Sequence, residues 1–156
     1  MKSMALYGER KAFYETKTTC FAVVEATVID WTSRARRSFE TVFSHPAKIE
    51  LLKKAQALGY RTYMYFIATE KPQINLARIR ARVKLGGHDV PEDKAAARYY
   101  RCLEQVKYAL PHLNRAYFFD NSADHSVFFA EYESNAGFQL HADSLPEWFK
   151  HFVLGE

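Results

Sequence analysis

The chain has 156 residues, a net charge of +4 at pH 7, and a composition that is 48% hydrophobic and 15% aromatic. This length suits a single domain with a sizeable core, and the apolar content excludes a disordered chain. No apolar run approaches the ~18 residues of a membrane-spanning helix, and residues 1–17 lack the apolar core of a secretory signal. Cys20 and Cys102 are far apart and are expected to be reduced thiols. The sequence therefore predicts a cytoplasmic protein with no membrane partner.

The start of the chain is ambiguous. Residues 20–31 place Val23, Val24 and Trp31 on one possible helical face, whereas the β-branched residues of segment 18–24 equally suit a buried strand. The helical pattern is the one we favour here.

The remaining elements are short and separated by Gly or Pro. Strands are predicted at residues 38–44, 61–69, 115–119, 126–134 and 137–143. Helices are predicted at residues 47–58, 72–85, 92–110 and 146–154. The run RTYMYFIAT is almost continuously apolar, which is typical of a parallel strand covered on both faces.

This order of elements predicts an α/β fold over residues 1–156, a three-layer sandwich with a mostly parallel sheet and a C-terminal antiparallel hairpin plus helix. In such sheets ligands bind beyond the carboxyl ends of the strands. Those ends are polar here, at residues 40–45, 68–71 and 120–122. The sequence thus indicates a site at this edge.

Arginines gather in three short clusters. They lie at positions 34, 36 and 37, at 78, 80 and 82, and at 98 and 101. Such clusters suit phosphate-bearing partners, although each also fits a solvated helix face. Nucleic acid is the least favoured partner, because no recognition motif accompanies the first cluster.

Three segments together resemble one known family. They are SFETVFSHPAKIELLKKAQALGYRTYMYFIAT, INLARIRARVKLGGHDVPEDKAAARYYR and RAYFFDNS. In this combination the chain resembles, over roughly residues 21–133, the zeta-toxin family of P-loop kinases, in its chromosomal branch of small-molecule kinases. The resemblance implies a P-loop kinase-like fold and ATP-dependent phosphoryl transfer, with Mg²⁺, to a hydroxyl of a small molecule such as a nucleotide sugar.

The resemblance also implies roles for particular residues. Arg82 would reach the transferred phosphate and Arg98 would add a second positive charge. The acceptor substrate would lie near Glu40, Thr41 and Ser44. The lid turn would be Gly86, Gly87 and His88, and the nucleotide would lie near Asp120, Asn121 and Ser122. Arginine suits this chemistry, because phosphoryl transfer needs positive charge against the phosphate oxygens.

Several of these residues also have purely structural interpretations. Glu40 could pair with a basic residue at the sheet edge, and His88 could cap a helix C-terminus. Asp120-Asn121-Ser122 would make a good turn and cap without any ligand.

The P-loop pattern GxxxxGK[ST] does not occur in the sequence. We therefore expect a zeta-toxin-like domain truncated at its N-terminus, a degenerate kinase in which the central P-loop strand is missing or replaced. Residues 18–24 could act as a surrogate strand, a second copy could pair across the gap as a homodimer, or the chain could fold poorly. The alternative function is a non-catalytic dimerising or interaction module derived from that fold, such as an antitoxin-like regulator. The histidines show no metal-ligand spacing, so Mg²⁺ is expected only with ATP.

Overall fold

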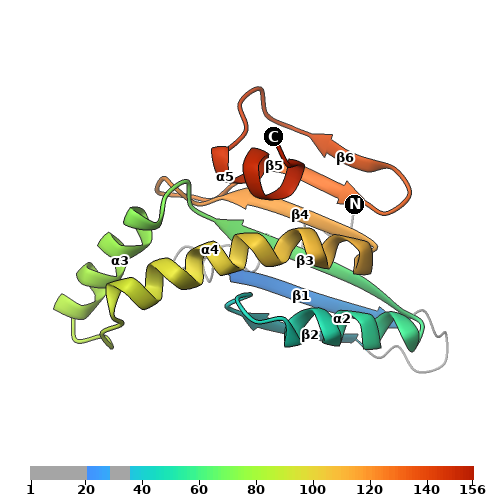
Figure 1. Ribbon diagram of the computed structural model, residues 1–156, viewed down its shortest axis with the longest axis horizontal. Helices are drawn as coiled ribbons and strands as arrows, with labels where there is room; N and C mark the ends of the chain where they lie inside the picture. The colour runs from blue at the N-terminus through green and yellow to red at the C-terminus, as the bar shows by residue number, and fades with distance from the viewer. Residues whose placement is uncertain (1–20, 29–35) are drawn as a thin grey trace.

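The computed structural model describes residues 21–28 and 36–156, which form one six-stranded sheet with helices packed against it (Figure 1). The strand order is β2-β1-β3-β4-β5-β6. The strands are β1 (Phe21–Val28), β2 (Arg36–Thr41), β3 (Tyr60–Ala68), β4 (Arg115–Asp120), β5 (Val127–Glu133) and β6 (Gly137–Leu140). The helices are α2 (Ala47–Ala57), α3 (Pro72–Lys84), α4 (Glu92–Ala109) and α5 (Glu147–Phe149), with a 3₁₀ turn η1 (Leu110–His112) and a π-helical turn η2 (Lys150–Leu154). The fold is α/β with a mixed sheet.

The helix that the sequence favoured near the start of the chain is wrong. Residues 21–28 form β1, which is antiparallel to β2 on one side and to β3 on the other. The eight residues of β1 exchange backbone hydrogen bonds with two neighbours, and this pairing suits their β-branched composition better than a helix would. The strand alternative is confirmed for residues 21–24, the part of segment 18–24 that the structure describes, and its role as a surrogate for a P-loop strand stays a prediction.

The prediction of a mostly parallel sheet is also wrong. Among the described strands only β3 and β4 form a parallel pair, and the other four pairs are antiparallel. A parallel pair needs a long crossover, which α3 and α4 supply between β3 and β4. The helix α2 also links two strands that point the same way, β2 and β3, but β1 lies between them. The C-terminal antiparallel hairpin, β5–β6, followed by a helix is confirmed.

One face of the sheet carries the main core. Met64, Phe66 and Phe118 are fully buried on this face, where α2, α4 and α5 pack over them. Each buried side chain of this size stabilises the fold by about 1.5–3 kcal/mol. The described helices that pack on the sheet therefore form one layer, and the third layer of the predicted sandwich stays a prediction. The opposite face carries a smaller cluster around Ile67, Tyr117 and Phe119.

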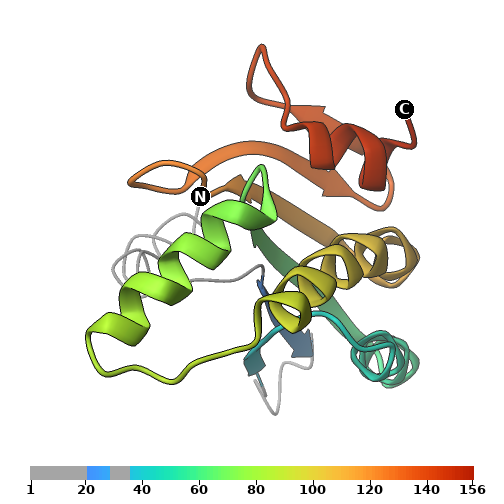
Figure 2. The same ribbon diagram turned by 60° about the vertical axis from the view of Figure 1, so that its left-hand side comes forward.

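The helix α3 lies beyond the ends of β3 and β4 (Figure 1). Pro72 starts it, as expected for proline in a first helical turn, and residues 85–91 connect it to α4 (Figure 2). In the described ranges no helix combines the length and apolarity that crossing a bilayer requires.

Candidate functional site

The carboxyl ends of β2, β3 and β4 lie at one edge of the sheet. These three strands point the same way, because β1 is antiparallel to both β2 and β3, and β3 is parallel to β4. Ala68 pairs with Asp120, so the ends of β3 and β4 are direct neighbours. Thr41 pairs with Ala22 of β1 and thus lies two strand spacings from β3, roughly 10 Å. The predicted edge therefore exists, and the residues that were predicted to bind the acceptor and the nucleotide lie on different strands of it.

The Asp120-Asn121-Ser122 turn is fastened to the end of β3. The Ser122 hydroxyl donates to Asp120 Oδ1 at 2.6 Å and accepts the backbone N–H of Glu70 at 2.7 Å. The backbone N–H of Asn121 donates to the carbonyl of Ala68 at 2.7 Å, and Asn121 itself is buried. These contacts match the structural interpretation of the turn. The turn also fixes the backbone at the position where a ligand would meet the edge.

Tyr99 anchors α4 to the same edge. Its ring is 4% exposed, and its hydroxyl donates to the carbonyl of Thr69 at 2.8 Å. Because an unpaired buried hydroxyl is costly, this bond fixes the rotation of α4 relative to β3. The residues just after β3 are thus held from two sides, by Ser122 and by Tyr99.

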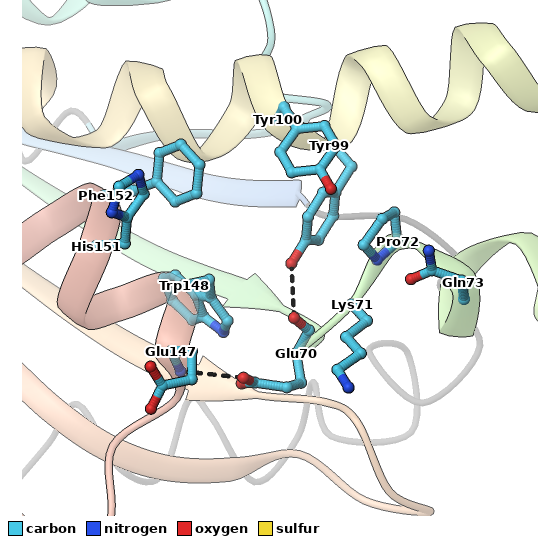
Figure 3. Close-up of a pocket in the computed structure, with 10 residues that line it drawn as sticks. All are labelled: Glu70, Lys71, Pro72, Gln73, Tyr99, Tyr100, Glu147, Trp148, His151 and Phe152. Carbon is cyan, nitrogen blue, oxygen red and sulfur yellow. Dashed lines mark hydrogen bonds between the residues drawn. The ribbon is translucent and has the colours of Figure 1, made fainter.

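Two clefts open at this edge and share Glu70 and Glu147. The first has a volume of about 350 Å³ and lies between the β3–α3 turn, α4 and the C-terminal helix (Figure 3). The second, of about 490 Å³, is lined by Asp120 and Ser122 together with residues of β5 and of the segment before α5. Glu70 Oε1 accepts the backbone N–H of Glu147 at 3.1 Å and so separates the two clefts.

The charge at the first cleft is mixed. Lys150 Nζ lies 2.7 Å from Glu147 Oε1, and this hydrogen bond raises the pKa of the lysine. Glu70, Lys71 and His151 also line this cleft. A polar ligand would therefore meet both acceptors and donors beside aromatic walls.

Arg82 and the glycines of the predicted lid lie together at the end of α3. The backbone N–H of Gly87 donates to the carbonyl of Arg82 at 3.0 Å, and a Cβ at Gly87 would lie 2.7 Å from Arg82 Cγ. Gly86 has a φ of 86°, a conformation that glycine adopts without strain. Gly87 therefore gives the Arg82 side chain its space, while His88 is exposed just beyond.

Arg98 is exposed on α4, and neither it nor Arg82 lines either of the two clefts described above. The other two arginines of the 78–82 cluster form contacts between elements of the fold. Arg78 Nη2 donates to the carbonyl of Ala123 at 3.0 Å, which ties α3 to the turn after β4. Arg80 Nε lies 2.6 Å from Glu92 Oε1 and joins α3 to the first turn of α4.

The predicted acceptor residues lie at the end of β2. Glu40 is exposed, and Thr41 and Ser44 are half-buried. The Thr41 hydroxyl donates to the carbonyl of Val42 at 3.2 Å, a local contact that a ligand could replace. These residues share the edge with Asp120 and Ser122 but do not line the two clefts.

The described residues do not fit a P-loop. That loop follows the carboxyl end of a strand, whereas β1 is antiparallel to β3 and places its first residue, Phe21, opposite Ile67 near the candidate edge. β1 therefore cannot lead into a phosphate-wrapping loop there. Within the described ranges, no group of three or more His, Cys, Asp or Glu side chains could hold a metal ion.

The sequence-based reading missed Glu70, Tyr99 and Trp148. Glu70 could have been found, because it directly follows the clearest strand and precedes Lys-Pro. Tyr99 and Trp148 look like core aromatics in the sequence. Only their packing against the end of β3 reveals that they line a cleft.

Comparisons with known proteins add one partial relative. No family model matches the sequence, and no solved structure matches it. A stretch of 60 residues, 38% of this chain, is 40% identical to a protein of Haemophilus influenzae whose description is "Uncharacterized protein". The matched stretch spans 43% of that protein, less than half its length. The chain is thus similar over this stretch to a bacterial protein whose description names no activity.

Proposed function

We propose that this chain is a zeta-toxin-like kinase domain, acting in the cytoplasm, that keeps a phosphate-binding edge but transfers phosphate slowly or not at all. The observation that carries the proposal is the common direction of β2, β3 and β4, which brings their polar carboxyl ends to one edge. Ligands of α/β sheets bind at such edges.

The arginines of α3 and α4 supply the charge that a phosphate needs. Arg82 lies at the end of α3, which extends beyond this edge, and Arg98 lies on α4, which Tyr99 ties to β3. A guanidinium can hold two phosphate oxygens at once. An acceptor hydroxyl would bind near Glu40, Thr41 and Ser44, across β1 from the phosphate.

The expected low activity follows from the lack of a P-loop pattern in the sequence. In P-loop enzymes the backbone N–H groups of that loop wrap the phosphates, and its lysine neutralises them. ATP bound through arginines alone would be held, with Mg²⁺ as its companion, but positioned less well for transfer.

Calorimetry with ATP and Mg²⁺ tests the proposal. We expect micromolar binding that Arg82→Ala weakens by about 1–3 kcal/mol, the contribution of a charged hydrogen bond. Lys107→Ala, which removes a positive charge near the other end of α4, is the matched control and should change little. Binding weaker than about millimolar, or equal losses in both variants, would contradict the proposal and favour the non-catalytic interaction module.

A further inference from the structure

The strand β6 forms an open edge of the sheet. It pairs with β5 on one side and with no described strand on the other (Figure 1). Proteins usually protect such edges with charged side chains, proline or a short strand, because unpaired backbone groups recruit other strands. The four residues of β6, GFQL, include no charge and no proline, so a short length is the only protection of this kind in the strand itself. This edge can therefore accept another strand.

The outward backbone groups of β6 follow from one hydrogen bond. The backbone N–H of His141 donates to the carbonyl of Phe129 at 2.8 Å, in the same register as the β5–β6 pairs. Residues of an antiparallel strand alternate between bonding to a neighbour and pointing away from it. Gln139 therefore bonds to β5, whereas the N–H and C=O groups of Phe138 and Leu140 point to the outer side. Each of these two residues offers one donor and one acceptor to a further strand.

The side chains of β6 divide between the two faces of the sheet. Phe138 lies on the face that carries the main core, with its ring centroid 5.7 Å from that of Phe149. Side chains alternate along a strand, so Leu140 lies on the same face, where it is 52% exposed. Gln139 is exposed on the opposite face. The core side of this edge is thus apolar and continues into solvent at Leu140.

We propose that β6 pairs with β6 of a second copy of this chain, antiparallel and about a twofold axis at Gln139. Phe138 then lies opposite Leu140 of the second copy, and Leu140 lies opposite the second copy's Phe138. The outward groups of the two strands meet in both pairs, and Leu140 gains an aromatic cross-strand neighbour. On the other face the two Gln139 amides, each both donor and acceptor, lie opposite one another. His141 of the second copy lies opposite Gly137, which has no side chain.

The charge and size of this contact determine its strength. The residues of β6 carry no charge, so the pairing buries no ion and places no like charges opposite each other. Two four-residue strands form a smaller contact than the roughly 1,200–2,000 Å² of stable complexes, and we expect a Kd on the order of 10–100 µM. The surface lies at the far edge of the sheet from β2, so it differs from a homodimer across the missing strand. It uses neither Arg82 nor Arg98, so the dimer and the phosphate-binding edge can fail independently.

Sedimentation equilibrium at concentrations that bracket this Kd tests the pairing. Leu140→Pro removes one outward N–H but none of the bonds to β5, and proline is tolerated in an edge strand. It should raise the Kd of the dimer by about tenfold or more. Leu140→Val, the matched control, keeps the donor and an apolar side chain and should leave the Kd nearly unchanged. A wild-type chain that stays monomeric, or equal Kd values for the two variants, would overturn the proposal.

A single introduced cysteine tests the register, and it carries the test if Leu140→Pro unfolds. At the twofold axis the two copies of residue 139 form a non-hydrogen-bonded pair, with Cα atoms about 4.5 Å apart, which a disulfide can bridge. The two copies of residue 140 would lie roughly 9 Å apart, too far for a disulfide. Both variants carry Cys20→Ser, and Cys102 is buried. Mild oxidation should link Gln139→Cys at least about tenfold more than Leu140→Cys. Equal linking of the two variants, or none in Gln139→Cys, would contradict the pairing.

Discussion

The hydroxyl of Ser122 lies 2.7 Å from the backbone nitrogen of Glu70, and through this contact the turn after β4 holds the end of β3. The same hydroxyl donates to Asp120 Oδ1 at 2.6 Å, so one side chain satisfies two partners at once. Glu70 in turn borders both clefts. The geometry of the candidate site thus depends on a serine that contacts the first cleft only through Glu70.

Replacement of Ser122 should loosen this edge. Ser122→Ala removes the acceptor of the Glu70 N–H and the donor to Asp120, and we expect a loss of about 1–2 kcal/mol in the free energy of unfolding. Urea denaturation measures it, with Ser134→Ala, at an exposed turn position, as the control. Equal stability of the two variants would show that water replaces the Ser122 contacts without cost.

The hydroxyl of Tyr99 should contribute more to the free energy of unfolding than the hydroxyl of Tyr100. Tyr99→Phe leaves the buried carbonyl of Thr69 without its 2.8 Å partner, at a cost of about 1–2 kcal/mol in the free energy of unfolding. Tyr100→Phe is the matched control, because Tyr100 is 46% exposed and water can solvate the groups around it. Thermal and urea unfolding should separate the two variants. A larger loss for Tyr100→Phe would contradict the anchoring role of Tyr99.

The effects of substitutions at Gly87 and Arg82 on the free energy of unfolding should depend on each other. Gly87→Ala places a Cβ 2.7 Å from Arg82 Cγ and 3.0 Å from its carbonyl oxygen, an overpacking that costs about 1–3 kcal/mol in the free energy of unfolding. Part of that cost should vanish in an Arg82→Ala background, where the clash with Cγ is gone. A double-mutant cycle on unfolding free energies measures this coupling. Strict additivity would mean that the backbone contact alone sets the cost.

The ion pair between α3 and α4 should be visible in a pH titration. The hydrogen bond from Arg80 holds the pKa of Glu92 below its ordinary value. A lowered pKa in the folded state stabilises the fold above the ordinary pKa of a glutamate, and this contribution disappears as the pH falls through the folded pKa. Arg80→Gln should raise the pKa of Glu92 toward its ordinary value, which NMR titration of the side-chain carboxyl detects. Added salt should reduce the difference, because both groups are exposed.

The sequence predicted helices and strands well wherever a Gly or Pro boundary coincided with the end of a periodic apolar pattern. Pro72 and Gly59 mark a helix start and a helix end within a residue or two of the observed bounds. The strand β1 was missed because its sequence suits both a helix and a strand. Its strand conformation is decided by pairing with β2 and β3, and β3 lies more than thirty residues away along the chain.

The shared edge of the strand ends was predictable from the sequence, but the contacts at that edge were not. The polar strand ends at Thr41 and Asp120 share an edge, as the order of elements indicated. The bond between Ser122 and Glu70 joins residues 52 positions apart, and the bond between Glu70 and Glu147 joins residues 77 positions apart. Such contacts follow from tertiary packing, so no local pattern could have revealed that these side chains are already engaged.

The position of β1 between two antiparallel partners makes the continuity of the sheet depend on one segment. If β1 detaches, β3 keeps its pairing with β4 but presents a row of open backbone groups along its other side. A row of this kind recruits strands from other molecules. We therefore expect that mild heating or low denaturant, before global unfolding, would drive concentration-dependent strand exchange and aggregation of this protein.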